Sequence, residues 1–285
     1  MNIQILTDSA ADLAPSQLSV LPIHFTTLRL SLGGEPFTGT NEEFYKKLSE
    51  TDEYPVTSQA AAGEFAEIYR NVAKKDPDIL SIHISGGLSG TINSARVGAS
   101  MVPEAKVTFW DSRTLSAALG WQVEAAARMV VKGFKLDKIL ERLTQIRDTV
   151  DGMFTLKEMK YLIHGGRVSH LKGLLASVLN IKPIIGVDHV TGMYTNAAQD
   201  MTFKRAMARM IGLDKTRYAG MGPLRAQIVH GHNPEGVEFI RKKAEEELQC
   251  TFDDTVPVAP ALGAHTGPSL AGIIVGPKAL FADLY

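Results

Sequence analysis

The sequence contains a single cysteine, Cys250, among its 285 residues. One cysteine cannot form a disulfide within the chain, which is typical of proteins in a reducing compartment. No apolar stretch reaches the ~18 residues that a membrane-spanning helix needs. The first residues, MNIQILTDSA, lack the basic start and the longer apolar core of a signal peptide. We therefore expect a cytoplasmic protein.

The sequence also lacks an excess of charge of either sign. It has 30 Lys and Arg residues against 31 Asp and Glu residues, which gives a formal net charge of −1. Proteins that bind nucleic acid usually have a basic patch or a basic stripe interleaved with aromatic residues, and none is visible here. We therefore expect no nucleic-acid partner.

The motifs of several common enzyme classes are missing. The segment GGLSGT at 86–91 has no P-loop lysine, and its glycines lack the spacing of a dinucleotide-binding turn. His230 and His232 are two residues apart, but neither a cysteine nor a His-Glu-x-x-His pattern accompanies them. Asp8 and Asp12 suggest Mg²⁺ chemistry, although an Asp-Ser at a strand end is more typical of a helix cap. We expect no catalytic residues and no metal site.

The first half of the chain alternates apolar runs with helical patterns, which is typical of an α/β domain with a parallel sheet. The expected strands cover 3–6, 20–26, 28–32, 79–84 and 107–110. The expected helices follow Thr57-Ser58 up to about residue 74, cover 115–131, and follow the amphipathic pattern of 139–150.

The pattern changes near residue 155, which predicts an α/β domain over 1–154 and a smaller α+β domain over 155–285. Expected elements here are a strand at 151–156, a short helix closed by Gly165-Gly166, a hairpin around 190–192, a helix from 203, a strand at 226–229 and a helix at 235–248. Apolar residues at helical spacing predict a further helix over 171–179, and this helix is our candidate for a segment that moves to admit a ligand.

A glycine-rich turn follows the expected strand at 79–84. Gly86, Gly87 and Gly90 surround the hydroxyls of Ser89 and Thr91 at the start of an expected helix. Backbone N–H groups and hydroxyls at a helix start suit an anion. The alternative is an ordinary helix cap by Ser89 or Thr91, which stabilises a helix by ~1 kcal/mol. The loop taken alone leaves both interpretations open.

Thr57 and Ser58 form a second pair of hydroxyls, at another expected junction between a strand and a helix. Each can place its hydroxyl at the start of that helix. In an open α/β sheet such junctions gather at the carboxyl ends of the strands, where ligands tend to bind. Two hydroxyl pairs of this kind favour a ligand site more than either pair does alone.

Arg167 and His265 are the candidates for further polar contacts. Gly165 and Gly166 end a helix directly before Arg167, whose planar guanidinium suits a carboxylate or a phosphate; a surface salt bridge is the alternative. His265 stands in a stretch of small residues bracketed by glycines, where a backbone can approach a ligand closely. For His265, a role in the core and a ligand contact both remain open.

These motifs occur together and in order. They are TDSAADL at 7–13, TSQ at 57–59, SGGLSGTINSA at 85–95, WDS at 110–112, LKEMKYLIHGGRVS at 156–169, KPI at 182–184 and GAHTGP at 263–268. The combination spans nearly the whole chain and resembles the DegV family, whose members are bacterial fatty-acid-binding proteins. Ser269 stands where the family more often has glycine, which is expected to affect the loop after His265.

The resemblance implies an α/β N-terminal domain and a smaller α+β C-terminal domain, with one fatty acid held in a tunnel between them. It implies that the fatty-acid carboxylate is bound by hydroxyls of Thr57 or Ser58 and of Ser89. It also implies that Arg167 and His265 belong to the surrounding polar network.

The resemblance further implies a lipid carrier without catalysis or cofactor of its own. Related proteins present the fatty-acid carboxyl group to a separate fatty acid kinase, which holds the ATP and forms the acyl phosphate. The expected partners are a long-chain fatty acid, such a kinase subunit and, transiently, a membrane surface. The rival hypothesis is an enzyme, a phosphotransferase or a hydrolase, that acts on a small acid in the same cleft. The missing P-loop lysine and metal cluster favour the carrier.

Overall fold

The computed structural model describes residues 3–171 and 181–285. Within these ranges the strands form sheets of four, three and seven strands. The first sheet contains β1 (Gln4–Asp8), β2 (Ile23–Thr26), β6 (Asp78–His83) and β7 (Lys106–Asp111). The second contains β3 (Arg29–Leu32), β4 (Glu35–Pro36) and β5 (Val56–Ser58). The third contains β8 (Asp151–Thr155), β9 (Lys182–Val187), β10 (Tyr194–Asp200), β11 (Leu224–His230), β12 (Cys250–Phe252), β13 (Val256–Pro257) and β14 (Ala271–Pro277).

The α-helices of the described residues connect and cover these sheets. They are α1 (Pro15–Leu18), α2 (Asn41–Glu50), α3 (Ala62–Ala73), α4 (Thr91–Ser100), α5 (Ser116–Val131), α6 (Leu136–Thr149), α7 (Lys160–His164), α8 (Phe203–Arg217), α9 (Pro234–Glu247) and α10 (Pro260–Thr266). Short 3₁₀ turns follow β1 and α7, at Ser9–Ala11 and Arg167–Leu171, and another follows β14 at Lys278–Phe281.

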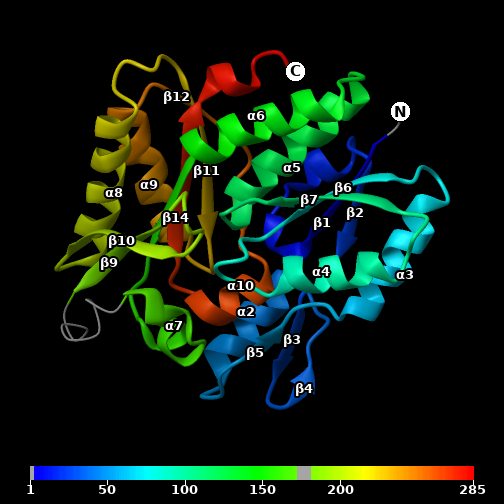
Figure 1. Ribbon diagram of the computed structural model, residues 1–285. Helices are drawn as coiled ribbons and strands as arrows, with labels where there is room; N and C mark the ends of the chain where they lie inside the picture. The colour runs from blue at the N-terminus through cyan, green and yellow to red at the C-terminus, as the bar shows by residue number, and fades with distance from the viewer. Residues whose placement is uncertain (1–2, 172–180) are drawn as a thin grey trace.

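The four-stranded sheet confirms the expected parallel α/β architecture. Its strand order is β2-β1-β6-β7, and every neighbouring pair is parallel. Helices α3 and α4 pack together on one side of this sheet, and α5 contacts β1 and β6 (Figure 1). Because the sheet is covered in this way, β6 is buried almost along its whole length, including its polar residues Ser81 and His83.

The three-stranded sheet corrects one prediction. Thr57 and Ser58 do not lie at the start of a helix, because β5 pairs antiparallel with β3 and Leu30 lies opposite Thr57. The following helix, α3, begins only at Ala62, and the Glu64 carboxylate accepts the Ala61 N–H at 2.6 Å. Glu64, in the first turn of α3, therefore provides the side-chain contact at the helix start that Thr57 or Ser58 was expected to provide.

The seven-stranded sheet has the order β10-β9-β8-β14-β11-β12, with β13 also paired to β11. The predicted hairpin is confirmed, since β9 and β10 pair antiparallel. Helices α8 and α9 cover one face of the sheet, and α5 and α6 contact it from the other side (Figure 1). Strand β8 spans the expected domain boundary at 154/155, and the division into 1–154 and 155–285 stays a prediction.

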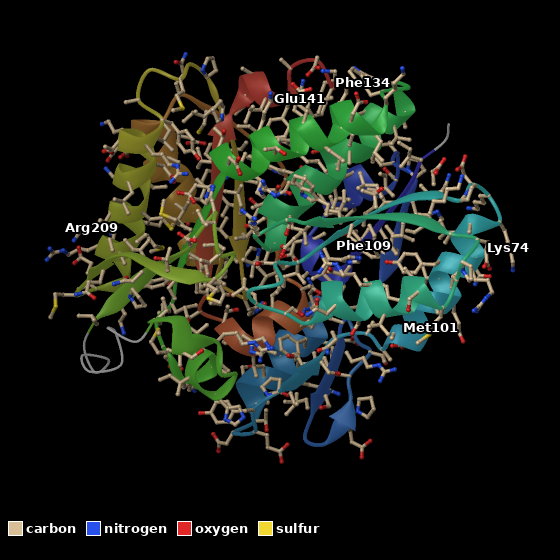
Figure 2. All side chains as sticks on the ribbon, in the orientation of Figure 1. Lys74, Met101, Phe109, Phe134, Glu141 and Arg209 are labelled. Carbon is tan, nitrogen blue, oxygen red and sulfur yellow. The ribbon has the colours of Figure 1, made fainter. Side chains whose placement is uncertain are left out.

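Helix α5 connects the two larger sheets, because it contacts β1 and β6 on one side and β8 and β11 on the other. Almost all of its residues from Ser116 to Ala127 are buried. At the periphery, Figure 2 shows charged side chains such as Lys74, Glu141 and Arg209 pointing away from the protein. None of the described helices is both long and apolar enough to span a membrane. The helix expected over 171–179 lies, except for Leu171, outside the described residues.

Candidate functional site

The residues singled out in the sequence line one pocket, here called the polar pocket. Thr57 and Ser58 come from β5, Ser89 from the loop after β6, Arg167 from the turn after α7, and His265 from α10. Side chains that the sequence did not single out complete its lining: Leu28, Gln59, Ile84, Leu88, Leu115, Tyr194, Ala261 and Leu262. The fold thus brings together five polar side chains from four segments that are separated in the sequence.

Thr57 and His265 are in direct polar contact, with 2.7 Å between Thr57 Oγ1 and His265 Nε2. His265 Nδ1 is buried and has no hydrogen-bond partner among the described residues. A Cβ at Gly165 would collide with the imidazole, so a glycine is needed at this point of the turn. A proton on Nε2 avoids leaving a buried N–H without an acceptor. His265 then donates to Thr57, and the hydroxyl proton of Thr57 is available to a ligand.

Burial lowers the pKa of His265 to about 4, and the nearby positive charge of Arg167 acts in the same direction. The imidazole is therefore neutral at pH 7. Among the described residues that line the polar pocket, Arg167 is then the one with a charged side chain. A pocket with one cation and several neutral donors suits a monoanion better than it suits a phosphate dianion.

Arg167 is half-buried and begins the 3₁₀ turn that follows α7. Its Nη1 donates a hydrogen bond to the Gly165 carbonyl oxygen at 2.6 Å, which fixes the direction of the side chain. No described carboxylate forms an ion pair with it. The alternative of a surface salt bridge is therefore not seen in the described part of the chain, and the remaining N–H groups of Arg167 are left for water or a ligand.

The loop after β6 both leads into α4 and lines part of the pocket. The N-cap residue of α4 is Gly90, which has no side chain, but the Ser89 hydroxyl accepts the N–H of Thr91, the first residue of α4, at 3.3 Å. The hydroxyls of Ser89 and Thr91 also bond to each other at 2.8 Å. A Cβ at Gly87 would lie 2.7 Å from the Thr191 carbonyl oxygen, and Gly86 N–H donates to the Asp111 carboxylate at 3.2 Å. These glycines therefore serve contacts within the protein, and only Ser89 and Leu88 of this loop line the pocket.

Gln59 and Tyr194 are the polar residues of the pocket lining that sequence reasoning missed. Gln59 is exposed, and a Cβ at Gly90 would lie 3.0 Å from its side-chain nitrogen. Its place in the TSQ motif was the one available signal. Tyr194 is buried at the start of β10, and burial raises the pKa of its hydroxyl. Nothing in the local pattern around Tyr194 distinguishes it from an ordinary strand residue.

A second hollow, here called the apolar cavity, adjoins the polar pocket, since Leu115, Tyr194 and Leu262 line both. The rest of its lining is mostly aliphatic and aromatic: Thr114, Ser116, Gly152, Met153, Phe154, Val229, Val258, Thr266, Leu270 and Ile274. The lining comes from α5 and α10 and from strands of the seven-stranded sheet. A polar pocket with a single cation therefore continues into an apolar space.

Helix α10 carries His265, and the sequence did not predict this helix. Its signals are Pro260 at the first turn and Gly267 just past the end. Its start is held by Asp12, whose carboxylate accepts hydrogen bonds from Ala259 N–H at 2.8 Å and from the Ser116 hydroxyl. Burial raises the pKa of Asp12 to about 7, although both hydrogen bonds act in the opposite direction. Asp12 thus joins three segments around the site.

The other polar motifs have structural roles. Asp8 caps the turn after β1 by accepting the Ala10 N–H at 3.0 Å, as an Asp-Ser at a strand end predicts. The hydroxyl of Ser269 accepts the Lys157 N–H at 3.0 Å, so this departure from the family pattern anchors the loop after α10. The described residues contain no group of three or more metal-ligating side chains, at His230 and His232 or elsewhere.

The low pKa of His265 predicts how its contribution to stability depends on pH. An unfolded histidine titrates near 6.5, so between pH 6.5 and 4 the unfolded chain binds a proton that the folded chain does not. The contribution is complete above pH 6.5 and is lost as the pH falls toward 4. Relative to His265→Gln, the wild type should lose about 2 kcal/mol of unfolding free energy between pH 7 and pH 5.

This difference is measurable by urea denaturation of both proteins at pH 7 and pH 5. The variant serves as the reference because Asp12, with its raised pKa, stabilises the folded state as the pH falls and opposes His265. Equal pH dependence in the two proteins would contradict a buried neutral imidazole at this position.

Comparison with known proteins identifies the family of the chain. A family model described as "Uncharacterised protein, DegV family" matches residues 2–278. A DegV domain-containing protein of Staphylococcus aureus is 32% identical over 280 residues, which cover 95% of this chain and 97% of that protein.

Two solved structures have the same fold. One is described as "Fatty Acid Binding of a DegV family Protein from Thermus thermophilus"; it is 26% identical, has a TM-score of 0.88, and the match covers 97% of this chain and 100% of that chain. The other is DegV, a fatty acid binding protein from Bacillus subtilis; it is 27% identical, has a TM-score of 0.87, and the match covers 98% and 100% of the two chains. With the family model matched over nearly its whole length, the chain belongs to the DegV family.

Proposed function

We propose that this protein carries one long-chain fatty acid, with its carboxylate in the polar pocket and its acyl chain in the apolar cavity between the two domains. The observation that carries the proposal is the junction of these two spaces at Leu115, Tyr194 and Leu262. A fatty acid has the matching division, because one end is a monoanion and the rest is hydrocarbon.

The carboxylate is proposed to bind through Arg167 and the hydroxyls of Thr57, Ser58 and Ser89. Hydrogen bonds to a charged group contribute about 1.5–3 kcal/mol each. In this arrangement His265 is a positioning residue, because it orients Thr57 through the 2.7 Å contact to Oγ1. No carboxylate lines the described part of the pocket to oppose an anion.

The acyl chain is proposed to supply most of the affinity. Each buried CH₂ contributes ~0.8 kcal/mol, from which the cost of ordering the ligand is subtracted. The two solved relatives described as binding fatty acids support this assignment, since both match the chain almost end to end. Long acyl chains are accordingly expected to bind more tightly than short ones.

We further propose that the protein presents the carboxylate to a separate kinase, which forms the acyl phosphate. Support comes from exposure: Ser58 and Gln59 line the polar pocket and are both exposed, while the walls of the apolar cavity are largely buried. The reactive end of the ligand is thus proposed to lie near the surface, within reach of a partner.

Reconstitution with a bacterial fatty acid kinase tests this presentation. The protein loaded with hexadecanoic acid is incubated with the kinase catalytic subunit and ATP, and acyl phosphate is trapped with hydroxylamine as the hydroxamate. The product is expected only when all three components are present. Product without the kinase would instead support the rival phosphotransferase. If the protein binds the fatty acid but no hydroxamate forms, presentation to the kinase is refuted and fatty-acid binding is not.

Removing a single hydroxyl should weaken binding without unfolding the protein. Ser89→Ala and Thr57→Val each delete one proposed donor to the carboxylate, at a cost of about 1.5–3 kcal/mol, or roughly 10- to 150-fold in Kd. Displacement of a fluorescent fatty acid measures the change. Ser100→Ala is the matched control, because Ser100 is an exposed serine of α4 whose hydroxyl donates to the Val97 carbonyl oxygen and does not line the polar pocket. Unchanged affinity in both variants would remove these loops from the site.

A further inference from the structure

The apolar cavity and a small polar crevice share one boundary, here called the wall. Gly152 of β8 and Thr114 line both the cavity and the crevice. Neither Gly152 nor Thr114 lines the polar pocket. The two spaces are therefore separated where a glycine contributes no side chain.

The far side of this wall is unsuitable for hydrocarbon. Asp151, directly before Gly152, forms an ion pair with Arg217 at 3.0 Å, and its carboxylate lies 3.5 Å from Nε2 of His189. Arg113 donates to the His189 carbonyl oxygen at 3.2 Å, and Arg147 also lines the crevice. Moving an acyl methyl group among these charges would displace their solvation without burying the methyl group in apolar surroundings. An acyl chain in the cavity must therefore end at the wall.

The strand pairing of Gly152 determines what a side chain here would do. Gly152 lies opposite Ile274 of β14 in antiparallel register. A Cβ at Gly152 would lie 3.5 Å from Ile274 Cγ1 and 3.6 Å from Ala118 Cβ, which are ordinary van der Waals distances. One methyl group thus fits without displacing its neighbours. Ile274 lines the cavity and Ala118 lines the crevice, so that methyl group would lie at the boundary between the two spaces.

We propose that Gly152 determines the longest acyl chain that this protein accommodates. The missing side chain leaves room for the last carbons of the ligand, and any larger residue at this position shortens the preferred chain. This inference rests on the proposed function and specifies its ligand class: fatty acids whose terminal methyl group reaches the wall at Gly152 and Thr114.

The test measures Kd for saturated fatty acids from decanoic to icosanoic acid, by displacement of a fluorescent fatty acid from wild type, Gly152→Ala and Gly152→Val. The Cβ of Gly152→Ala should displace about one methylene, so affinity for the chain that binds wild type best should fall about fourfold, the factor equivalent to ~0.8 kcal/mol. Gly152→Val should cause a larger loss and move the preferred length to shorter chains. Decanoic acid should bind all three proteins equally.

Gly186→Ala is the matched control. Gly186 lies in the neighbouring strand β9, is buried, and does not line the cavity; its added Cβ would have no neighbour closer than 3.8 Å. This variant should keep the wild-type length profile, which separates a cavity effect from a general effect of alanine in a strand. Should Gly152→Val fail to fold, as judged by circular dichroism, Gly152→Ala still decides the question.

Two outcomes would overturn the inference while leaving the proposed function intact: equal loss of affinity at all chain lengths in the folded Gly152 variants, or an unchanged length profile. A shifted profile in Gly186→Ala would overturn it as well. Failure of the wild type to bind any member of the series would refute the proposed function itself, and the inference with it.

Discussion

Arg167→Gln is expected to weaken the binding of a long-chain fatty acid about 30-fold. Removing one partner of a buried charge pair costs about 2–5 kcal/mol, and the lower end applies here because the side chain is half-buried. The arginine has no described carboxylate partner that would be left behind, so the loss should fall on the ligand and not on the fold. Titration of wild type and variant with hexadecanoic acid measures the change.

Two controls show whether the lost interaction is the ion pair. Arg209→Gln is the matched variant: Arg209 also donates from Nη1 to a backbone carbonyl oxygen, that of Gln199, but it projects outward from α8 (Figure 2). It should bind hexadecanoic acid like the wild type. The second control is hexadecanol, which has the same chain without the charge and should lose little affinity in Arg167→Gln. A similar loss for acid and alcohol would contradict a carboxylate contact at Arg167.

Leu262→Trp should almost abolish fatty-acid binding. Leu262 is one of the three residues that line both the polar pocket and the apolar cavity, so an indole here is expected to block the passage between them. A ligand with its carboxylate in the pocket would then lose the burial of most of its chain. Losing even four CH₂ groups corresponds to ~3 kcal/mol, or more than 100-fold in Kd.

Leu262→Met is the control, because a hydrophobic substitution of similar volume usually costs less than about 1.5 kcal/mol of stability. It should fold and bind a fatty acid much like the wild type. The tryptophan variant should keep a cooperative thermal transition, since its indole occupies space that is otherwise available to a ligand. Full binding by a folded Leu262→Trp protein would show that the acyl chain does not pass this point.

Much of the fold is predictable from the sequence because local patterns determine it. The buried strand β6 is predicted from the apolar residues within 79–84, and α5 and the hairpin of β9 and β10 follow from periodicity and turn residues. The position of Thr57 in β5 is not predictable in this way, because it depends on pairing with β3, about 27 residues earlier in the chain. No local signal at Thr57 distinguishes a strand from the first turn of a helix.

The site shows the same division between local and long-range information. Each polar motif taken alone has an ordinary alternative, and it is their combination that indicates a ligand. Contacts between distant segments cannot be predicted from local sequence patterns. Examples are the contact between Thr57 and His265 and the hydrogen bond that the Asp12 carboxylate accepts at the start of α10. Tyr194 enters the pocket only because β10 returns beside β9.

Native mass spectrometry of the purified protein tests the central claim most directly. The account predicts a complex of one protein with one long-chain fatty acid, either as purified or after incubation with hexadecanoic acid, and denaturation should release the ligand. Leu262→Trp, treated in the same way, should appear only as the bare chain. A wild-type protein that stays bare after incubation with fatty acid, and instead gains the mass of ATP, would contradict the carrier and favour the rival enzyme.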